Sequence, residues 1–180
     1  YNAQDVTVER LIIRNASLDL VVPNTEAAID EIEDMVNGMG GYVVQSNVYS
    51  QGESKSASMQ VRIPAEKLDQ ALEQLRDLAT EVQRESISGD DVTDEYVDLQ
   101  SRLRHLEAVE AKLLEFLDEA EDTEAALAVY ERLAQVQADM ETTKGRIQYL
   151  EQSAAMATVS LNLTPDELNQ PIEVERWQPI

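Results

Sequence analysis

The first forty residues carry two hydrophobic periods in succession. Residues 9–22 are rich in Ile and Val, with apolar residues at alternate positions, which predicts a β-strand. Asn24 and Thr25 then precede an apolar stripe at helical spacing, and Gly40 and Gly41 follow it, which predicts a capped α-helix. This stripe consists of Ala28, Ile29, Ile32, Met35, Val36 and Met39.

The next segment predicts a strand hairpin and a second helix. Tyr42, Val44 and Val48 are expected on one face of a second strand, and a turn leads to a third strand. Pro64 opens an amphipathic helix, and a weaker, polar strand follows over residues 81–87. The third strand presents Ala57, Met59, Val61 and Ile63, and the helix presents Leu68, Ala71, Leu72, Leu75 and Leu78.

From Val92 the hydrophobic period becomes helical and stays so for about 60 residues. Apolar residues step by threes and fours, which is the a/d spacing of a coiled coil, and a polar break over residues 119–123 turns the chain. This pattern predicts two antiparallel helices. Their seams consist of Tyr96, Leu99, Leu103, Leu106, Val109, Leu113 and Phe116, and of Leu133, Val136, Met140, Thr143, Ile147, Leu150 and Ala154.

These elements predict the α+β class. The βαββαβ order is that of a ferredoxin-like antiparallel sheet with both helices on one face. Apolar residues alternate again over residues 157–163, so the long antiparallel coiled-coil hairpin is inserted before a final strand. We therefore expect a sheet domain, an inserted hairpin and a C-terminal linker. Their predicted bounds are 8–90 plus 155–164, 91–153, and 165–180.

The chain is strongly acidic. Its 36 acids and 14 bases leave a net charge of −22, which repels nucleic acids and anionic lipid headgroups. The bases are mostly Arg rather than Lys, which suits folding in high salt, although an ordinary solubilising surface explains the acids equally well. The chain has no Cys, so disulfides and thiolate chemistry are excluded.

The acidic stretch over residues 87–99 has two interpretations. The spacing of its acids is similar to that of a calcium-binding loop, which takes oxygens from alternate positions around a glycine. However, Gly89 precedes the acids, and Val92 must already lead into the helix. A structural joint fits this order better, with a turn at Gly89, Asp91 as the N-cap, and Asp94 and Glu95 beside the helix dipole. The alternative is that this stretch binds calcium.

No catalytic constellation stands out, and no cofactor is indicated. The one histidine, His105, lies within the first predicted arm and has no local partner for a triad or a zinc site. The sequence has no Gly-rich phosphate loop and no nucleophile elbow. Two carboxylates alone could hydrolyse a glycan, but 36 acids make accidental pairs inevitable. We therefore assign no catalytic, cofactor-binding or metal-ligating residue.

The tip of the predicted hairpin has more apolar residues than one seam needs. We expect these residues to offer a docking surface for a partner protein or a second copy, with packing inside the hairpin as the alternative. They are Leu114, Leu117, Leu127, Val129 and Tyr130.

Several of these segments together resemble a family of domains of unknown function, the one numbered 4349. The resemblance rests on residues 14–18, 40–43, 61–65, 89–99, 102–103, 145–147 and 157–159. It implies an extracytoplasmic domain of a cell-envelope protein, held by an N-terminal signal or lipoprotein anchor and often by a C-terminal transmembrane helix. Gln137 and Met140 stand where the family tends to have Arg and Ile, so one ion pair between the arms is in question.

These observations favour a non-enzymatic, membrane-tethered domain that binds a protein partner or self-associates through its hairpin. The alternative is a sensor domain that binds an ion or small ligand at the acidic joint. An enzyme acting on envelope glycans is a third reading, which would require two carboxylates facing each other across a cleft.

Overall fold

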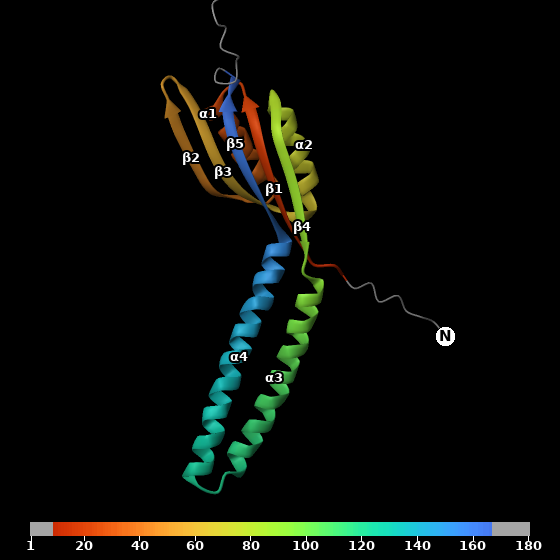
Figure 1. Cartoon of the computed structure of the whole chain (residues 1–180), viewed down its shortest axis with the longest axis vertical. Helices are drawn as coiled ribbons and strands as arrows, with labels where there is room; N and C mark the ends of the chain where they lie inside the picture. Colours follow the sequence, from red (N-terminus) through yellow and green to blue (C-terminus); the bar gives the residue numbers. More distant parts are fainter. Residues whose placement is uncertain (1–8, 167–180) are drawn as a thin grey trace, which may run out of the picture. The chain divides into compact units, whose positions relative to one another are not determined.

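The computed structural model describes residues 9–166 and confirms the α+β class, the βαββαβ beginning and the helical hairpin before the last strand (Figure 1). The strands are β1 (Ile12–Val22), β2 (Tyr42–Gln51), β3 (Ser54–Pro64), β4 (Glu81–Asp91) and β5 (Met156–Pro165). The helices are α1 (Thr25–Gly38), a 3-10 turn η1 (Ala65–Lys67), α2 (Leu68–Leu78), α3 (Thr93–Glu119) and α4 (Thr123–Ala155).

The five strands form one mixed sheet in the order β2-β3-β5-β1-β4. The last strand of the sequence lies in the middle of this sheet. There β5 pairs in parallel with β1, so that Leu18 lies beside Leu161, and antiparallel with β3, so that Met59 lies beside Leu161. In a simple ferredoxin-like sheet β1 and β3 are neighbours, but here β5 lies between them. The pairing of β5 with β1 adds one parallel pair to the expected antiparallel arrangement.

The direction of β5 follows from the connection that precedes it. The Thr80 N–H donates to the Val21 carbonyl (2.8 Å) and the Val92 N–H to the Leu11 carbonyl (2.9 Å), so β4 runs antiparallel to β1. The connection from β4 to β5 consists of two antiparallel helices, so β5 begins at the end of the sheet where β4 finishes. The strand after such a connection runs opposite to the strand before it, and β5 is therefore parallel to β1.

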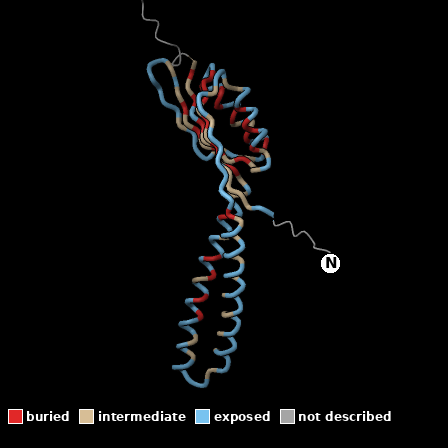
Figure 2. The backbone as a smooth tube through the Cα atoms, turned by 45° about the vertical axis from the view of Figure 1, so that its right-hand side comes forward, coloured by how far each residue is buried: buried red, intermediate tan, exposed pale blue. Residues whose placement is uncertain are grey.

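One face of the sheet is buried beneath α1 and α2 (Figures 1 and 2). The strands supply inward-facing residues at alternate positions, as their sequences predict, and the helices supply their apolar stripes. Burying this aliphatic surface is the main favourable contribution to folding of the sheet. The fully buried large side chains are Leu18, Leu20, Ile32, Met59, Ile63, Leu68, Leu72, Leu75, Leu161 and Leu163 among others.

The face prediction for β2 is wrong. Tyr42 lies beside Arg62, which points away from the core, whereas Val48 lies beside the buried Ala57. The pairing register shifts around Val44, and such a bulge inserts one residue that reverses the alternation beyond it. Tyr42 and Val48 therefore occupy opposite faces of the sheet. The side chains of Tyr42, Val44 and Val48 are all exposed.

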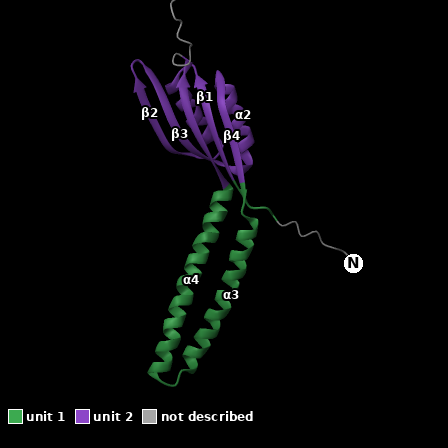
Figure 3. Cartoon of the chain, viewed as in Figure 1, with its two compact units in different colours: residues 1–13, 90–155 green, residues 14–89, 156–180 purple. Residues whose placement is uncertain are grey.

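The described residues belong to two compact units (Figure 3). Of the described residues, unit 1 comprises 9–13 and 90–155, which include the hairpin, and unit 2 comprises 14–89 and 156–166, which include α1, α2 and nearly all of the sheet. The predicted C-terminal linker lies outside the described residues except for Pro165, which ends β5, and Asp166.

The hairpin seam is buried unevenly between its two helices. In α4 the buried residues are Leu133, Val136, Met140, Thr143 and Leu150, whereas α3 has no buried residue (Figure 2). The apolar seam of α3 is only half-buried. One predicted member is wrong: Phe116 is exposed, and Leu117, four residues after the half-buried Leu113, is half-buried in its place.

Two glycines provide a test of local packing. A Cβ at Gly41 would lie 2.2 Å from the Arg62 carbonyl oxygen, whereas a Cβ at Gly145, within α4, meets nothing within 4 Å. We expect Gly41→Ala to lower the free energy of unfolding by about 2–3 kcal/mol through this clash. Gly145→Ala should raise it by about 0.5–1 kcal/mol, because alanine favours a helix.

Urea denaturation of both variants checks this expectation. Equal effects of the two substitutions, or a Gly41→Ala protein as stable as the parent, would contradict the close approach of β3 to the end of α1.

Candidate functional site

The base of the hairpin is held by two polar contacts between its helices. The Arg146 guanidinium donates to the Glu95 carboxylate (2.6 Å), and the Tyr96 hydroxyl donates to Glu151 (2.6 Å). The Arg146 hydrogen bond holds the pKa of Glu95 below its usual range. The Glu151 carboxylate raises the pKa of the Tyr96 hydroxyl, because it accepts that proton. These contacts fix the register of α3 against α4.

The joint before α3 is built differently from the prediction. Strand β4 continues through Gly89, so the turn lies later, and Val92 rather than Asp91 is the N-cap residue. The Asp91 carboxylate instead accepts hydrogen bonds from the hydroxyl (2.5 Å) and the N–H (3.1 Å) of Thr93. Thr93 in turn accepts from the Leu11 N–H (2.9 Å). Asp91 therefore ties the first helical residue to the strand that precedes it.

The acids of this joint do not converge. The hydrogen bonds from Thr93 lower the pKa of Asp91, and Arg10 (3.7 Å) adds a smaller effect. Asp94 lines the same surface pocket as Arg10 and Asp91, and both Asp90 and Asp94 are exposed. No group of three acidic or histidine side chains within residues 9–166 is arranged to hold a metal ion. The arrangement explains a helix start and offers no observation in favour of a calcium receptor.

Midway along the hairpin, a side-chain hydrogen bond joins the two helices. The Gln137 amide donates to the Glu110 carboxylate (3.2 Å). Gln137 is one of the two residues at which the family resemblance put a cross-arm ion pair in question. At this position the two arms are joined by an amide–carboxylate contact.

The predicted docking residues at the tip separate into two groups. Leu114, Leu127 and Tyr130 are exposed, the last two at 55% and 61%. Leu117 and Val129 are half-buried and belong to the seam. Phe116, which was predicted as a seam residue, is also exposed and lies 5.4 Å from the Lys112 ammonium. The tip therefore presents apolar side chains outside the seam on both helices.

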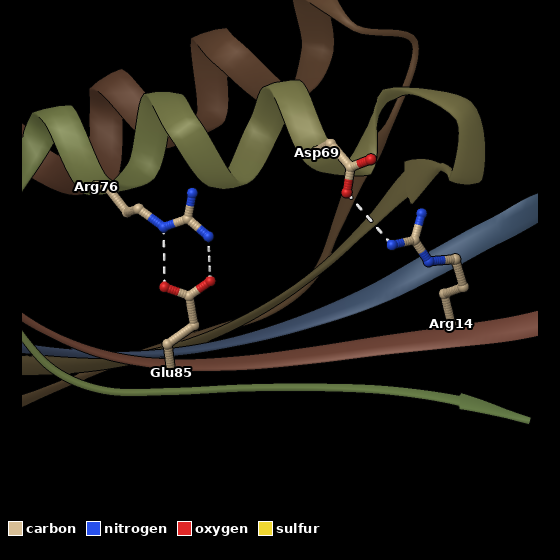
Figure 4. Close-up of polar contacts among 4 residues, drawn as sticks. All are labelled: Arg14, Asp69, Arg76 and Glu85. Atoms are coloured by element: carbon tan, nitrogen blue, oxygen red, sulfur yellow. Dashed lines mark hydrogen bonds and ion pairs between the residues drawn. The ribbon is translucent and has the colours of Figure 1, made fainter.

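His105 is exposed on α3, as a flank residue would be. In the sheet unit, two ion pairs beneath α2 are structural (Figure 4). Arg76 of α2 donates two hydrogen bonds to Glu85 of β4, which lowers the pKa of Glu85, and Arg14 of β1 lies 3.3 Å from Asp69 of α2. Both pairs join α2 to the strands beneath it.

A family model described as "Domain of unknown function (DUF4349)" matches residues 10–180. No curated protein and no solved structure matches the chain. Within residues 9–166, no helix combines the length and the apolar character that a membrane span requires.

The Glu95–Arg146 contact predicts a pH effect with a definite sign. Because the folded pKa of Glu95 is lowered, the contact stabilises the hairpin above the unfolded pKa, and this stability is lost as the pH falls through the folded pKa. In Arg146→Gln, we expect the pKa of Glu95 to rise toward that of a free glutamate. Lys144→Gln, which removes a neighbouring base on α4, should leave it in place.

Carboxyl NMR titration of the parent and both variants measures this shift. A Glu95 pKa that is unchanged in Arg146→Gln, or that rises equally in Lys144→Gln, would show that overall charge rather than the direct hydrogen bond sets it.

Proposed function

We propose that this chain, which belongs to the DUF4349 family, is a non-enzymatic interaction domain that binds a protein partner or a second copy through its α3–α4 hairpin. The observation that carries this proposal is the incomplete burial of α3. A helix of 27 residues with a regular apolar seam has no buried side chain in the described structure. A further helix packed against this seam would remove that surface from water and stabilise the assembly.

The exposed tip supports the same proposal. Leu127 and Tyr130 are three residues apart on α4, so they lie on one face of that helix, and Leu114 and Phe116 are exposed on α3. Tyrosine is among the residue types that contribute most to the binding energy of protein interfaces. The surrounding residues of both helices are mainly acidic and would form a polar rim.

We further propose that the domain works outside the cytoplasmic membrane, tethered by an anchor. The support for this part is the family resemblance of the motif segments. Such a tether would place the hairpin where envelope proteins can meet it, and it would raise the effective concentration of a partner in the same membrane.

The proposal is tested by a photo-crosslinking amino acid at the tip. Placed at Ala128 in the full-length protein in its own cells, the probe should give a discrete protein adduct. Placed at Ala108, an exposed position on α3 away from the tip, it should give none or far less. Mass spectrometry of the adduct separates a partner protein from a second copy.

Variants then connect the adduct to the apolar tip. The double substitution Leu127→Ser, Tyr130→Ser should abolish crosslinking from Ala128. Tyr149→Ser, which removes a tyrosine of similar exposure on the same helix, should preserve it. An adduct that survives the double substitution, or equal labelling from Ala128 and Ala108, would refute the proposed interaction.

A further inference from the structure

We propose that strand β2 is a second interaction surface, on which two copies of the chain join their sheets by antiparallel β2–β2 pairing. β2 is one edge of the described sheet, since β3 is its only neighbouring strand there (Figure 1). The outward N–H and C=O groups of an edge strand can therefore pair with another strand. This surface lies in the sheet unit and is independent of the hairpin interaction.

The two edges of the sheet differ in how they are protected. Natural sheets protect exposed edges with charged residues, which oppose pairing with another strand. The edge strand β4 follows this rule, because its charged residues are Glu81, Arg84, Glu85, Asp90 and Asp91. The other edge strand, β2, has the sequence Tyr-Val-Val-Gln-Ser-Asn-Val-Tyr-Ser-Gln and contains no charged residue. In a chain with 28% charged residues, this uncharged edge is a marked departure.

The side chains of β2 are also suited to a strand partner. Tyr42, Val44, Val48 and Tyr49 are exposed at 52%, 51%, 48% and 54%, although each is a residue type that favours paired strands. Tyr49 lies beside Ser56 and Val48 beside the buried Ala57, so large side chains are exposed on both faces of the edge. Cross-strand pairs of aromatic and β-branched side chains stabilise antiparallel strands.

Electrostatics favour a second copy at this edge. The β2–β3 segment, residues 42–64, contains two bases, Lys55 and Arg62, against one acid, Glu53, which leaves a net charge of +1. The whole chain carries −22. Two copies repel each other across most of their surfaces, and this segment is one through which they can approach with less of that repulsion.

The geometry allows a symmetric contact. The bulge around Val44 limits regular pairing to the seven residues Gln45 to Gln51, which match the usual length of a strand. A two-fold axis at Val48 would place Val48 of one copy beside Val48 of the other, and Tyr49 beside Asn47. The helix-covered faces of both sheets would then lie on the same side, and the two five-stranded sheets would become continuous.

Sedimentation velocity of the chain over a wide concentration range, in physiological and in molar salt, tests the proposal. We expect a monomer–dimer equilibrium that is tighter in molar salt, because α1, on the covered face, is rich in acids. Val48→Lys places a charge at the centre of the pairing and should weaken the dimer at least tenfold. Ser86→Lys makes the same kind of change in the other edge strand, β4, and should leave the dimer unchanged.

A second measurement does not depend on variants. Hydrogen exchange of the parent protein should show protection of the β2 amides that increases with protein concentration, while the amides of β4 show no such increase. This readout decides the matter if Val48→Lys fails to fold.

Four results would overturn the proposal. These are a monomer at every concentration in both salts, a dimer that tolerates Val48→Lys, a dimer weakened equally by Ser86→Lys, and a monomer that protects β2 only when an extended peptide is added. The tip variant Leu127→Ser, Tyr130→Ser distinguishes the two surfaces. If it abolishes dimerisation and Val48→Lys does not, the hairpin is the site of association and the β2 proposal fails.

Discussion

The position of β5 between β1 and β3 is the constraint on which the sheet depends. Its inward residues Ala157, Val159, Leu161 and Leu163 are almost completely buried, and both neighbouring strands pair with it along most of their length. The Asn162 amide donates to the Asp19 carboxylate (2.7 Å) across 143 positions of sequence. The core therefore cannot be completed until α3 and α4 have folded back and delivered the last strand. Non-local pairing of this kind is slow to form.

The sequence predicts this fold well wherever one period is continuous. Leu18, Met59 and Leu161 alternate with polar neighbours, and the stripe of α2 lies on one helical face, so these elements and their buried faces are predictable. The position of β5 in the middle of the sheet was not, because alternation indicates a strand but not its neighbours. The faces of β2 were mispredicted because the residues around Val44 carry no glycine or other sign of a bulge.

The candidate sites show the same limit. The sequence shows an excess of apolar residues at the tip, but not which of them are exposed. The structure shows that Leu127 and Tyr130 are exposed, whereas Leu117 and Val129 are half-buried. Phe116 was misassigned because a seam can step from Leu113 by three residues to Phe116 or by four to Leu117, and both of these residues are apolar. The sequence alone shows that β2 has no charged residue. It does not show that β2 is an edge strand, and only at an edge does the lack of charge leave the strand open to pairing.

Hydrogen exchange of the Leu161→Asp variant tests the central claim about β5 most directly. An aspartate at this buried position should expel β5 from the sheet. We predict that amide protection is then lost throughout β1 and β3 and in α1 and α2, because the core has no other strand to join its halves. Persistent protection of β1 and β3 in this variant would contradict the account, since it would show that the sheet forms without its last strand.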